Sequence, residues 1–411
     1  MTRPSWLRSP VVAVAAVSAA AGFGQFGVTA ALGDVAEAFG EATEGLGAEV
    51  GMTGTTLGLG LAIIRLSSLA GLPIAAMADR VGRRRVLGTA AAGGLLLTLL
   101  AAASPGYWWF VAIFAAGRPL LTATIAVAGV TVAEHTSAKG RAAGVAFVGA
   151  AYAVGTGMLT IVRAFGLDFR MLFASTALPL LLLPLILRFV TEPVENQSES
   201  AGGLPGAVAR RWIPRLAVVS GLHFAVGFLS GPINTYLFLY GERVLGQPPA
   251  LVTAVFIGSG VSGFVGLLAG RWVADTVGRR IAAGTAMVVA AGAGIVTYWG
   301  TVPAMVAGFP LSVMAASAFT PAAGALDAEL FPRSVRAAAA GWLTSAQVGG
   351  AVAGLLLFGA LLEWTQSFQG AAVAIGIPVA FAALLYARLP ETRGRELEEI
   401  DAQDRPMAEP A

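Results

Sequence analysis

Two arginines, Arg65 and Arg118, interrupt long apolar segments of the 411-residue chain. Arg65 precedes Asp79 by 14 residues and Arg118 precedes Glu134 by 16, which corresponds to about 21 Å and about 24 Å along a helix. A charged side chain at such depth in a membrane is costly and therefore points to function. A guanidinium is a planar fork of donors that suits carboxylate, sulfate or phosphate groups. We therefore expect an anion-binding or proton-relay pair near the middle of the membrane.

A second interpretation of the two arginines stays open. Backbone carbonyls, or Asp34, could hold each guanidinium without any ligand. No acidic residue lies at the same depth in any predicted span, and Asp34 lies about 36 Å along the first span from Pro10, near its outer mouth. The two guanidinium groups are then expected to face a hydrated central cavity.

Other polar side chains fall near the same level. His223 follows Trp212 by eleven residues, about 16 Å into its span, where a near-neutral pKa suits a proton relay or a hydrogen-bond donor. Tyr152, Asn234 and Gln347 could line the cavity from neighbouring spans. For each of these four residues, packing or interhelical hydrogen bonding is the competing interpretation.

The composition places the chain in a membrane. Hydrophobic residues make up 56% of it and charged residues 12%, whereas soluble domains carry about 25% charge. The 26 basic residues are scattered between apolar stretches, which argues against a nucleic-acid partner. No cysteine is present and the two histidines are far apart, so we expect no metal site and no cofactor.

Apolar stretches of spanning length recur along the chain, since about 20 residues cross a bilayer. They predict an all-α membrane protein with twelve transmembrane helices. The first stretch is longer than the core of a signal peptide, so we expect it to be retained. The stretches cover residues 11–33, 52–77, 86–104, 107–133, 141–163, 169–190, 212–240, 250–274, 281–300, 302–328, 336–362 and 368–388.

Basic residues predict the orientation of the spans. Of the 26 Lys and Arg residues, 21 fall in segments on one side and three on the other (Arg163, Arg170 and Arg243), while Arg65 and Arg118 lie within spans. Because Lys and Arg accumulate on the cytoplasmic side, we expect both termini in the cytoplasm and the protein in a prokaryotic inner membrane.

The chain contains an internal repeat. Residues 79–84 (DRVGRR) recur as residues 275–280 (DTVGRR), an offset of 196, and the pairs Glu134/Arg141 and Glu329/Arg336 recur at an offset of 195. Two charged signatures at nearly the same offset indicate two pseudo-symmetric six-helix halves. We expect an N-terminal half over 1–190, a cytoplasmic linker over 191–211, a C-terminal half over 212–388 and a cytoplasmic tail over 389–411.

These motifs and the twelve spans resemble the major facilitator superfamily over nearly the whole chain. The resemblance implies the major facilitator fold, with charge networks that close the cytoplasmic gate when the transporter faces outward. The chain departs from the family pattern at Ala75 and Arg271, where the motif has Gly, and at Thr276, where it has a basic residue. The gating residues that the resemblance implies are Asp79, Arg80, Gly82, Arg83, Arg84, Glu134, Arg141, Asp275, Gly278, Arg279, Arg280, Glu329 and Arg336.

Two further strings are similar to those of the sugar porters and their metabolite:proton symporter relatives: residues 328–332 (AELFP) and 390–394 (PETRG), the latter followed by LEEI. The sugar porters' paired glutamines of helix seven and Trp of helix ten are replaced by GFLSG and PAA, and the helix-five motif of drug antiporters is absent. Arg118 resembles the helix-four Arg of symporters, which pairs with an acid of helix one. The residue at matching depth here is Gln25, which does not titrate, so proton coupling would use Asp34, Glu37 or the substrate.

We therefore expect a secondary active or facilitative transporter, not an enzyme, that moves a small organic solute by alternating access. The two arginines favour import of an anionic metabolite with protons. The expected partners are the solute, the lipid bilayer and protons, and the protein is expected to be a monomer. Efflux of drugs or metabolites and sugar transport stay open as alternatives. The residues expected to bind substrate are Gln25, Arg65, Arg118, Tyr152, His223, Asn234 and Gln347.

Overall fold

The computed structural model of the chain is all-helical over the part it describes, residues 9–40, 44–136, 140–191 and 208–393. Twelve helical segments in these residues are long and apolar enough to cross a membrane. The predicted fold class, an all-α membrane protein with twelve spans, is thereby confirmed. The predicted linker and tail lie largely outside the described residues, as does the side chain of Arg141.

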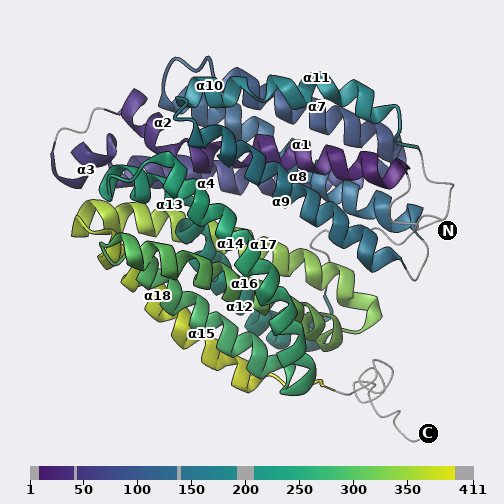
Figure 1. Ribbon diagram of the computed structural model, residues 1–411. Coiled ribbons are helices and arrows are strands. Elements are labelled where there is room, and N and C mark those ends of the chain that lie inside the picture. Colours follow the sequence, from purple (N-terminus) through teal and green to yellow (C-terminus); the bar gives the residue numbers. More distant parts are fainter. Residues whose placement is uncertain (1–8, 41–43, 137–139, 192–207, 394–411) are drawn as a thin grey trace, which may run out of the picture.

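The helices gather in two bundles that follow one another along the chain (Figure 1). The first bundle comprises α1 (Ser9–Ala30), α2 (Leu32–Phe39), α3 (Gly45–Val50), α4 (Gly54–Ser67), η2 (Ser68–Ala70), α5 (Gly71–Ala76), α6 (Ala78–Val81), α7 (Arg83–Ala101), α8 (Tyr107–His135), α9 (Arg141–Ala164), α10 (Phe169–Ala174) and α11 (Ala177–Leu187). The second comprises η3 (Arg210–Trp212), α12 (Ile213–Thr235), α13 (Leu237–Leu239), η4 (Tyr240–Val244), α14 (Pro249–Thr276), α15 (Arg279–Thr297), α16 (Val302–Leu330), α17 (Arg333–Thr365), α18 (Phe368–Ala382) and η5 (Ala383–Arg388).

The predicted second span is interrupted in its middle. Pro73 has no N–H to donate to the carbonyl of Leu69, and the helix tightens into η2 just before it. The hydroxyl groups of Ser67 and Ser68 donate to the carbonyls of Ile64 and Arg65, 2.9 Å and 2.6 Å away. Arg65 therefore lies in the last turn of α4, beside a break in the regular helix.

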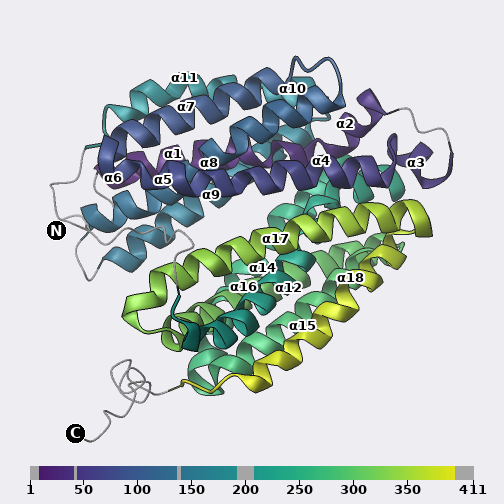
Figure 2. The ribbon, with the colours of Figure 1, turned by 180° about the vertical axis from the view of Figure 1, so that it is seen from behind.

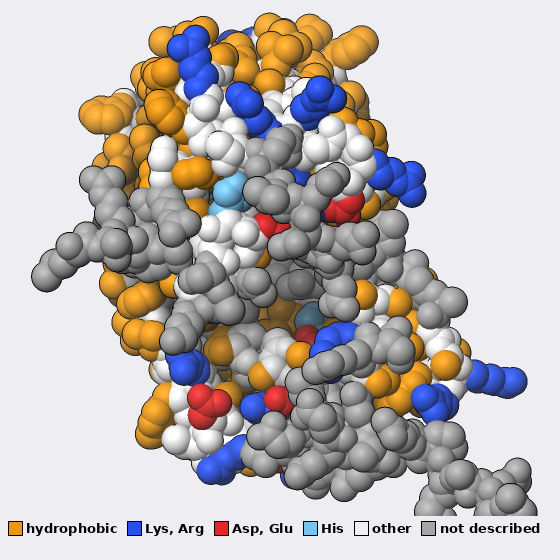
Figure 3. All heavy atoms as spheres, turned by 90° about the vertical axis from the view of Figure 1, so that its right-hand side faces the viewer, with side chains coloured by type: hydrophobic (Ala, Val, Ile, Leu, Met, Phe, Trp, Pro, Cys, Tyr) orange, Lys and Arg blue, Asp and Glu red, His pale blue; other side chains and the backbone are white. Residues whose placement is uncertain are grey.

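The two bundles meet at one end and diverge toward the other, as both ribbon views show (Figures 1 and 2). We call the end that carries α2, α3 and η4 the closed end, and the end that carries the turns at Gly82 and Gly278 the open end. Seen from the open end, the molecule is hollowed between the bundles (Figure 3).

Close backbone approach joins the bundles toward the closed end. α4 of the first bundle packs along α17 of the second, and α9 packs against α14. A Cβ atom at Gly54 or Gly58 of α4 would collide with the backbone of α17 around Leu355 and Gly359. Glycine at these positions therefore allows the two helices to touch.

Large apolar side chains cover the outside of both bundles. Leu181 of α11, Phe264 and Trp272 of α14 and Phe381 of α18 are among the exposed ones. In water such a surface would be a liability, whereas lipid tails solvate it. The fold is that of a multi-pass membrane protein.

Candidate functional site

A cavity with a volume of about 230 Å³ lies between the two bundles, and we call it the central cavity. Four helices of the first bundle (α1, α4, α8 and α9) and two of the second (α12 and α17) form its wall. It brings together five of the seven residues that the sequence predicts to bind substrate. The lining residues are Gln25, Phe26, Val28, Thr29, Leu61, Ile64, Arg65, Arg118, Tyr152, Ser230, Gly231, Asn234, Thr235 and Leu355.

Gln25 of α1 is the centre of a hydrogen-bond network in this wall. Its side-chain oxygen accepts a bond of 2.7 Å from the hydroxyl of Tyr152, and its amide nitrogen donates to Thr122 at 3.1 Å. Nη1 of Arg118 donates to the backbone carbonyl of Gln25 at 3.2 Å. The network fixes the amide and the phenol, and it places Arg118 beside α1.

The two arginines keep unused hydrogen-bonding capacity. Nε of Arg65 and Nε of Arg118 are buried and have no hydrogen-bond partner, and neither guanidinium forms an ion pair with a carboxylate among the described residues. Leaving such a buried donor unpaired costs about 1–3 kcal/mol. Of the alternative partners expected from the sequence, a backbone carbonyl binds Arg118 at one nitrogen only. Asp34 pairs with Arg163 and Arg243 and with neither of these two arginines. The site can therefore accept an anion.

Two predicted residues lie outside the lining of the central cavity. His223 of α12 lies with its Nε2 2.8 Å from Oδ2 of Asp327 in α16. Gln347 lies on α17, where its backbone carbonyl faces Gly227 of α12. Sequence reasoning does not identify Asp327, because this residue lies near the end of the predicted span 302–328 and not at the depth of the arginines. An ionisable residue inside a span was the available signal.

A cluster of charged residues links the bundles at the closed end. Arg163 of α9 binds Asp34 of α2 and Glu242 of η4, with 2.5 Å between Nη2 of Arg163 and Oε2 of Glu242. Arg243 of η4 also contacts the first bundle: its Nη2 lies 3.0 Å from Oδ1 of Asp34 and 2.5 Å from Oε2 of Glu37. Only 5% of the Arg163 side chain is exposed. We call these five residues the closed-end cluster, and it ties the second bundle to the first.

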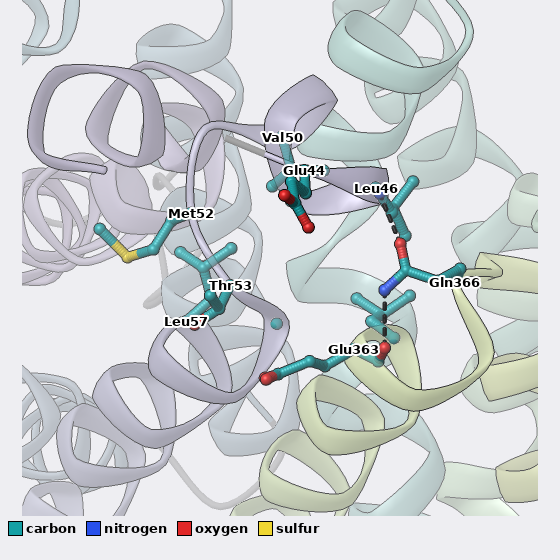
Figure 4. Close-up of a pocket in the computed structure, with 11 residues that line it drawn as sticks. Glu44, Leu46, Val50, Met52, Thr53, Leu57, Glu363 and Gln366 are labelled. Carbon is teal, nitrogen blue, oxygen red and sulfur yellow. Dashed lines mark hydrogen bonds between the residues drawn. The ribbon is translucent and has the colours of Figure 1, made fainter. Parts of the chain in front are cut away.

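A pocket beside this cluster shows further links between the bundles (Figure 4). The backbone N–H of Leu46 in α3 donates to the side-chain oxygen of Gln366 at 2.6 Å, and the amide of Gln366 donates to the carbonyl of Glu363 at 2.6 Å. Thr55 of α4 donates its N–H to the carboxylate of Glu363 at 3.2 Å. Gln366 adopts a left-handed conformation (φ 52°) that ends α17 and turns its side chain toward α3. The contacts around this pocket therefore help to hold the two bundles together at the closed end.

Charged residues of the first repeat meet at the open end. Nη2 of Arg83 lies 3.0 Å from Asp79 and 2.6 Å from Glu134, so it joins α6, α7 and α8 of one bundle. Gly82 has φ 106°, a conformation that favours glycine and allows the sharp turn between α6 and α7. Arg80 is exposed. Arg84 is the first-turn neighbour of Arg83 in α7.

The second repeat forms a related cluster, to which Glu391 contributes an additional carboxylate. Arg279 pairs with Glu329, as Arg83 pairs with Glu134, whereas Asp275 lies 3.8 Å from the exposed Arg271. The carboxylate of Glu391 accepts the backbone N–H groups of Arg279 and Arg280 at 2.9 Å and 3.3 Å and so caps α15.

Two other residues of the second repeat also make local contacts. Gly278 has φ 141° at the turn before α15, in the conformation that Gly82 adopts in the first repeat. Arg336 donates to the carbonyl of Phe331 at 3.2 Å.

Comparisons with known proteins agree with this fold. The sequence model of the Major Facilitator Superfamily matches residues 13–297 and 250–410. No curated protein sequence matches the chain. Among solved structures, the inward-open xylose transporter XylE from E. coli is similar at 20% identity, covering 96% of this chain and 98% of that one with a TM-score of 0.73.

Two further solved structures have the same fold. A bacterial homologue of the human lysosomal transporter Spinster is 15% identical, with coverage of 97% and 98% and a TM-score of 0.72. The human organic anion transporter TETRAN is 17% identical, with coverage of 94% and 100% and a TM-score of 0.65.

Proposed function

The chain belongs to the Major Facilitator Superfamily, and we propose that it imports a small organic anion across a prokaryotic inner membrane by alternating access. The observation that carries this proposal is the pair of guanidinium groups in the central cavity, which lack an acidic partner among the described residues. Two uncompensated cations at this depth are unfavourable without an anionic partner. A carboxylate or a comparable anion supplies both the charge and the missing acceptors.

The network around Gln25 supports binding of an anion at this point. Tyr152 donates a hydrogen bond to the side chain of Gln25, and this bond holds α1 and α9 together in the cavity wall without adding charge. Arg118 is anchored at one nitrogen to the Gln25 carbonyl and keeps its Nε free. A pre-positioned donor loses less entropy when the ligand binds.

The distribution of basic residues supports a central cavity that opens toward the cytoplasm. If Lys and Arg mark the cytoplasmic side, the open end is cytoplasmic and the structure faces inward. The closed-end cluster is then the outer gate, and Arg83 with Glu134 and Arg279 with Glu329 belong to the inner gate region. Transport requires the outer contacts to break as the inner ends approach.

Protons are the coupling ion that the side chains support. His223 and Asp327 form a hydrogen-bonded pair, with 2.8 Å between Nε2 and Oδ2, on two helices of the second bundle. Histidine and carboxylate side chains within spans are typical of proton relays in transporters. Proton binding at this pair would couple solute import to the proton gradient.

Transport in proteoliposomes tests the proposal. We expect the purified protein to exchange small carboxylates, and to lose this exchange in Arg65→Gln and Arg118→Gln. Arg170→Gln is the matched control, because Arg170 is bound to backbone carbonyls of its own bundle. Exchange of neutral sugars or cationic drugs that survives both cavity substitutions would favour the sugar or efflux alternative and overturn the proposal.

A further inference from the structure

A second cavity, with a volume of about 220 Å³, lies inside the second bundle. We call it the bundle cavity. Residues of α12, α15, α16 and α18 line it, and it shares Ser230 and Asn234 of α12 with the central cavity. Both cavities therefore border the stretch of α12 that carries Ser230 and Asn234.

The chemistry of the two walls differs. The residues that line the bundle cavity carry no formal charge, and its apolar part includes Leu229, Met287 and Phe319. Its polar groups are largely engaged with the backbone. The Ser312 hydroxyl donates to the carbonyl of Ala290 at 3.1 Å, and the Asn234 amide donates to that of Ser230 at 2.8 Å. The cavity favours an uncharged group and offers a second anion no cationic partner.

We infer that the substrate is an amphipathic monoanion, whose single anionic group binds Arg65 and Arg118 and whose uncharged body occupies the bundle cavity. This inference rests on the proposed anion transport and names its substrate class. Each cavity alone is smaller than the about 300–1,000 Å³ of typical small-molecule sites, and the two together fall within that range. A compact dianion would leave the bundle cavity empty.

A homologous series of probes measures the contribution of the body. Straight-chain monocarboxylates from propanoate to hexanoate are compared with α,ω-dicarboxylates of equal length and with the uncharged amides. The affinity of each compound is obtained from how strongly it inhibits carboxylate exchange in proteoliposomes. We expect about fourfold tighter binding for each added methylene group, because each buried CH₂ contributes a constant increment. The dicarboxylates and the amides should each bind at least tenfold more weakly than the matching monocarboxylate.

A substitution inside the bundle cavity locates the effect. Ala316 of α16 is exposed and lines this cavity, so Ala316→Phe fills it from the accessible side. We expect Ala316→Phe to weaken hexanoate by tenfold or more and to leave propanoate within twofold. Ala307→Phe is the matched control, because Ala307 is an exposed residue of the same helix outside both cavity linings.

The outcomes separate this inference from the proposed function. If all carboxylates bind with equal affinity, or dicarboxylates bind as well as monocarboxylates, the amphipathic substrate is wrong while anion transport stands. The same holds if Ala316→Phe affects propanoate and hexanoate equally. If no carboxylate competes and the amides do, the proposed anion transport fails together with this inference.

Discussion

Replacing Arg163 with Gln should open the closed-end cluster, which we propose to be the outer gate. Arg163 belongs to the first bundle and contacts Asp34 of the same bundle and Glu242 of the other. The substitution removes the cation that lies between the two carboxylates. Asp34 keeps its contact with Arg243, whereas Glu242 loses its direct ion-pair partner in the cluster. The closed end then contains a buried acid that is better solvated when the bundles separate.

The structure gives the size of the effect. Side-chain exposure is 5% for Arg163 and 7% for Glu242, so this is a buried pair. Removing one partner of a buried pair costs about 3–5 kcal/mol. We take about 3 kcal/mol, because hydration of the carboxylate in the outward-facing state recovers part of the loss. This changes the ratio of outward-facing to inward-facing molecules by about 100-fold.

Cysteine labelling measures this ratio. The chain contains no Cys, so a single Thr253→Cys substitution gives a signal without background. Thr253 of α14 is buried at the closed end, and its hydroxyl donates to the carbonyl of Thr160 in α9 at 3.0 Å. We expect Arg163→Gln to raise the rate of maleimide labelling at this position, in proportion to the outward-facing fraction and by at most about 100-fold.

The control lies at the same end of the molecule. Arg170 donates to the carbonyls of Ala102 and Ser104, which belong to its own bundle, so Arg170→Gln should leave the labelling rate within twofold. An unchanged rate in Arg163→Gln, or an equal increase in Arg170→Gln, would refute the assignment of the closed-end cluster as a gate.

Three further substitutions test the pair of His223 with Asp327, the contact between α4 and α17, and the cap of α15. His223→Gln should abolish proton-driven accumulation but retain downhill exchange, because the imidazole that pairs with Asp327 is lost, whereas His135→Gln should retain both; transport at imposed pH gradients checks this. Gly58→Leu should raise labelling at Thr253→Cys tenfold or more, since it separates α4 from α17, and Gly258→Leu, with open space at its Cβ, should not. Glu391→Gln should lower the free energy of unfolding by about 1 kcal/mol through the weakened cap of α15, measured by denaturation in detergent.

Apolar length predicted all twelve spans, because each must bury about 20 residues in lipid regardless of its partners. It could not predict the breaks within them. The tightened turn η2 depends on Pro73. The π-helical turn η4 forms where Tyr240 and Gly241 are buried at the closed end. Such local geometry depends on tertiary contacts, which a hydropathy pattern does not contain.

The candidate site was predictable only in part. Depth along a helix placed Arg65, Arg118 and Tyr152 at a common level, and the structure brings them to one cavity. Depth gives no rotation about the helix axis, so it could not show that Gln347 falls outside this lining. Nor could it pair His223 with Asp327, because tilted helices bring residues of different nominal depth together.

The affinity of small carboxylates for the parent protein and for Arg118→Gln is the most direct test of the central claim. We expect carboxylates to stabilise the purified parent against thermal unfolding, and xylose and cationic drugs to leave its stability unchanged. Arg118→Gln should weaken carboxylate binding by about thirtyfold or more, the loss that follows when a buried charge-assisted contact is truncated. Equal affinity in the two proteins, or stabilisation by xylose alone, would contradict the claim that the unpaired guanidinium groups bind the substrate.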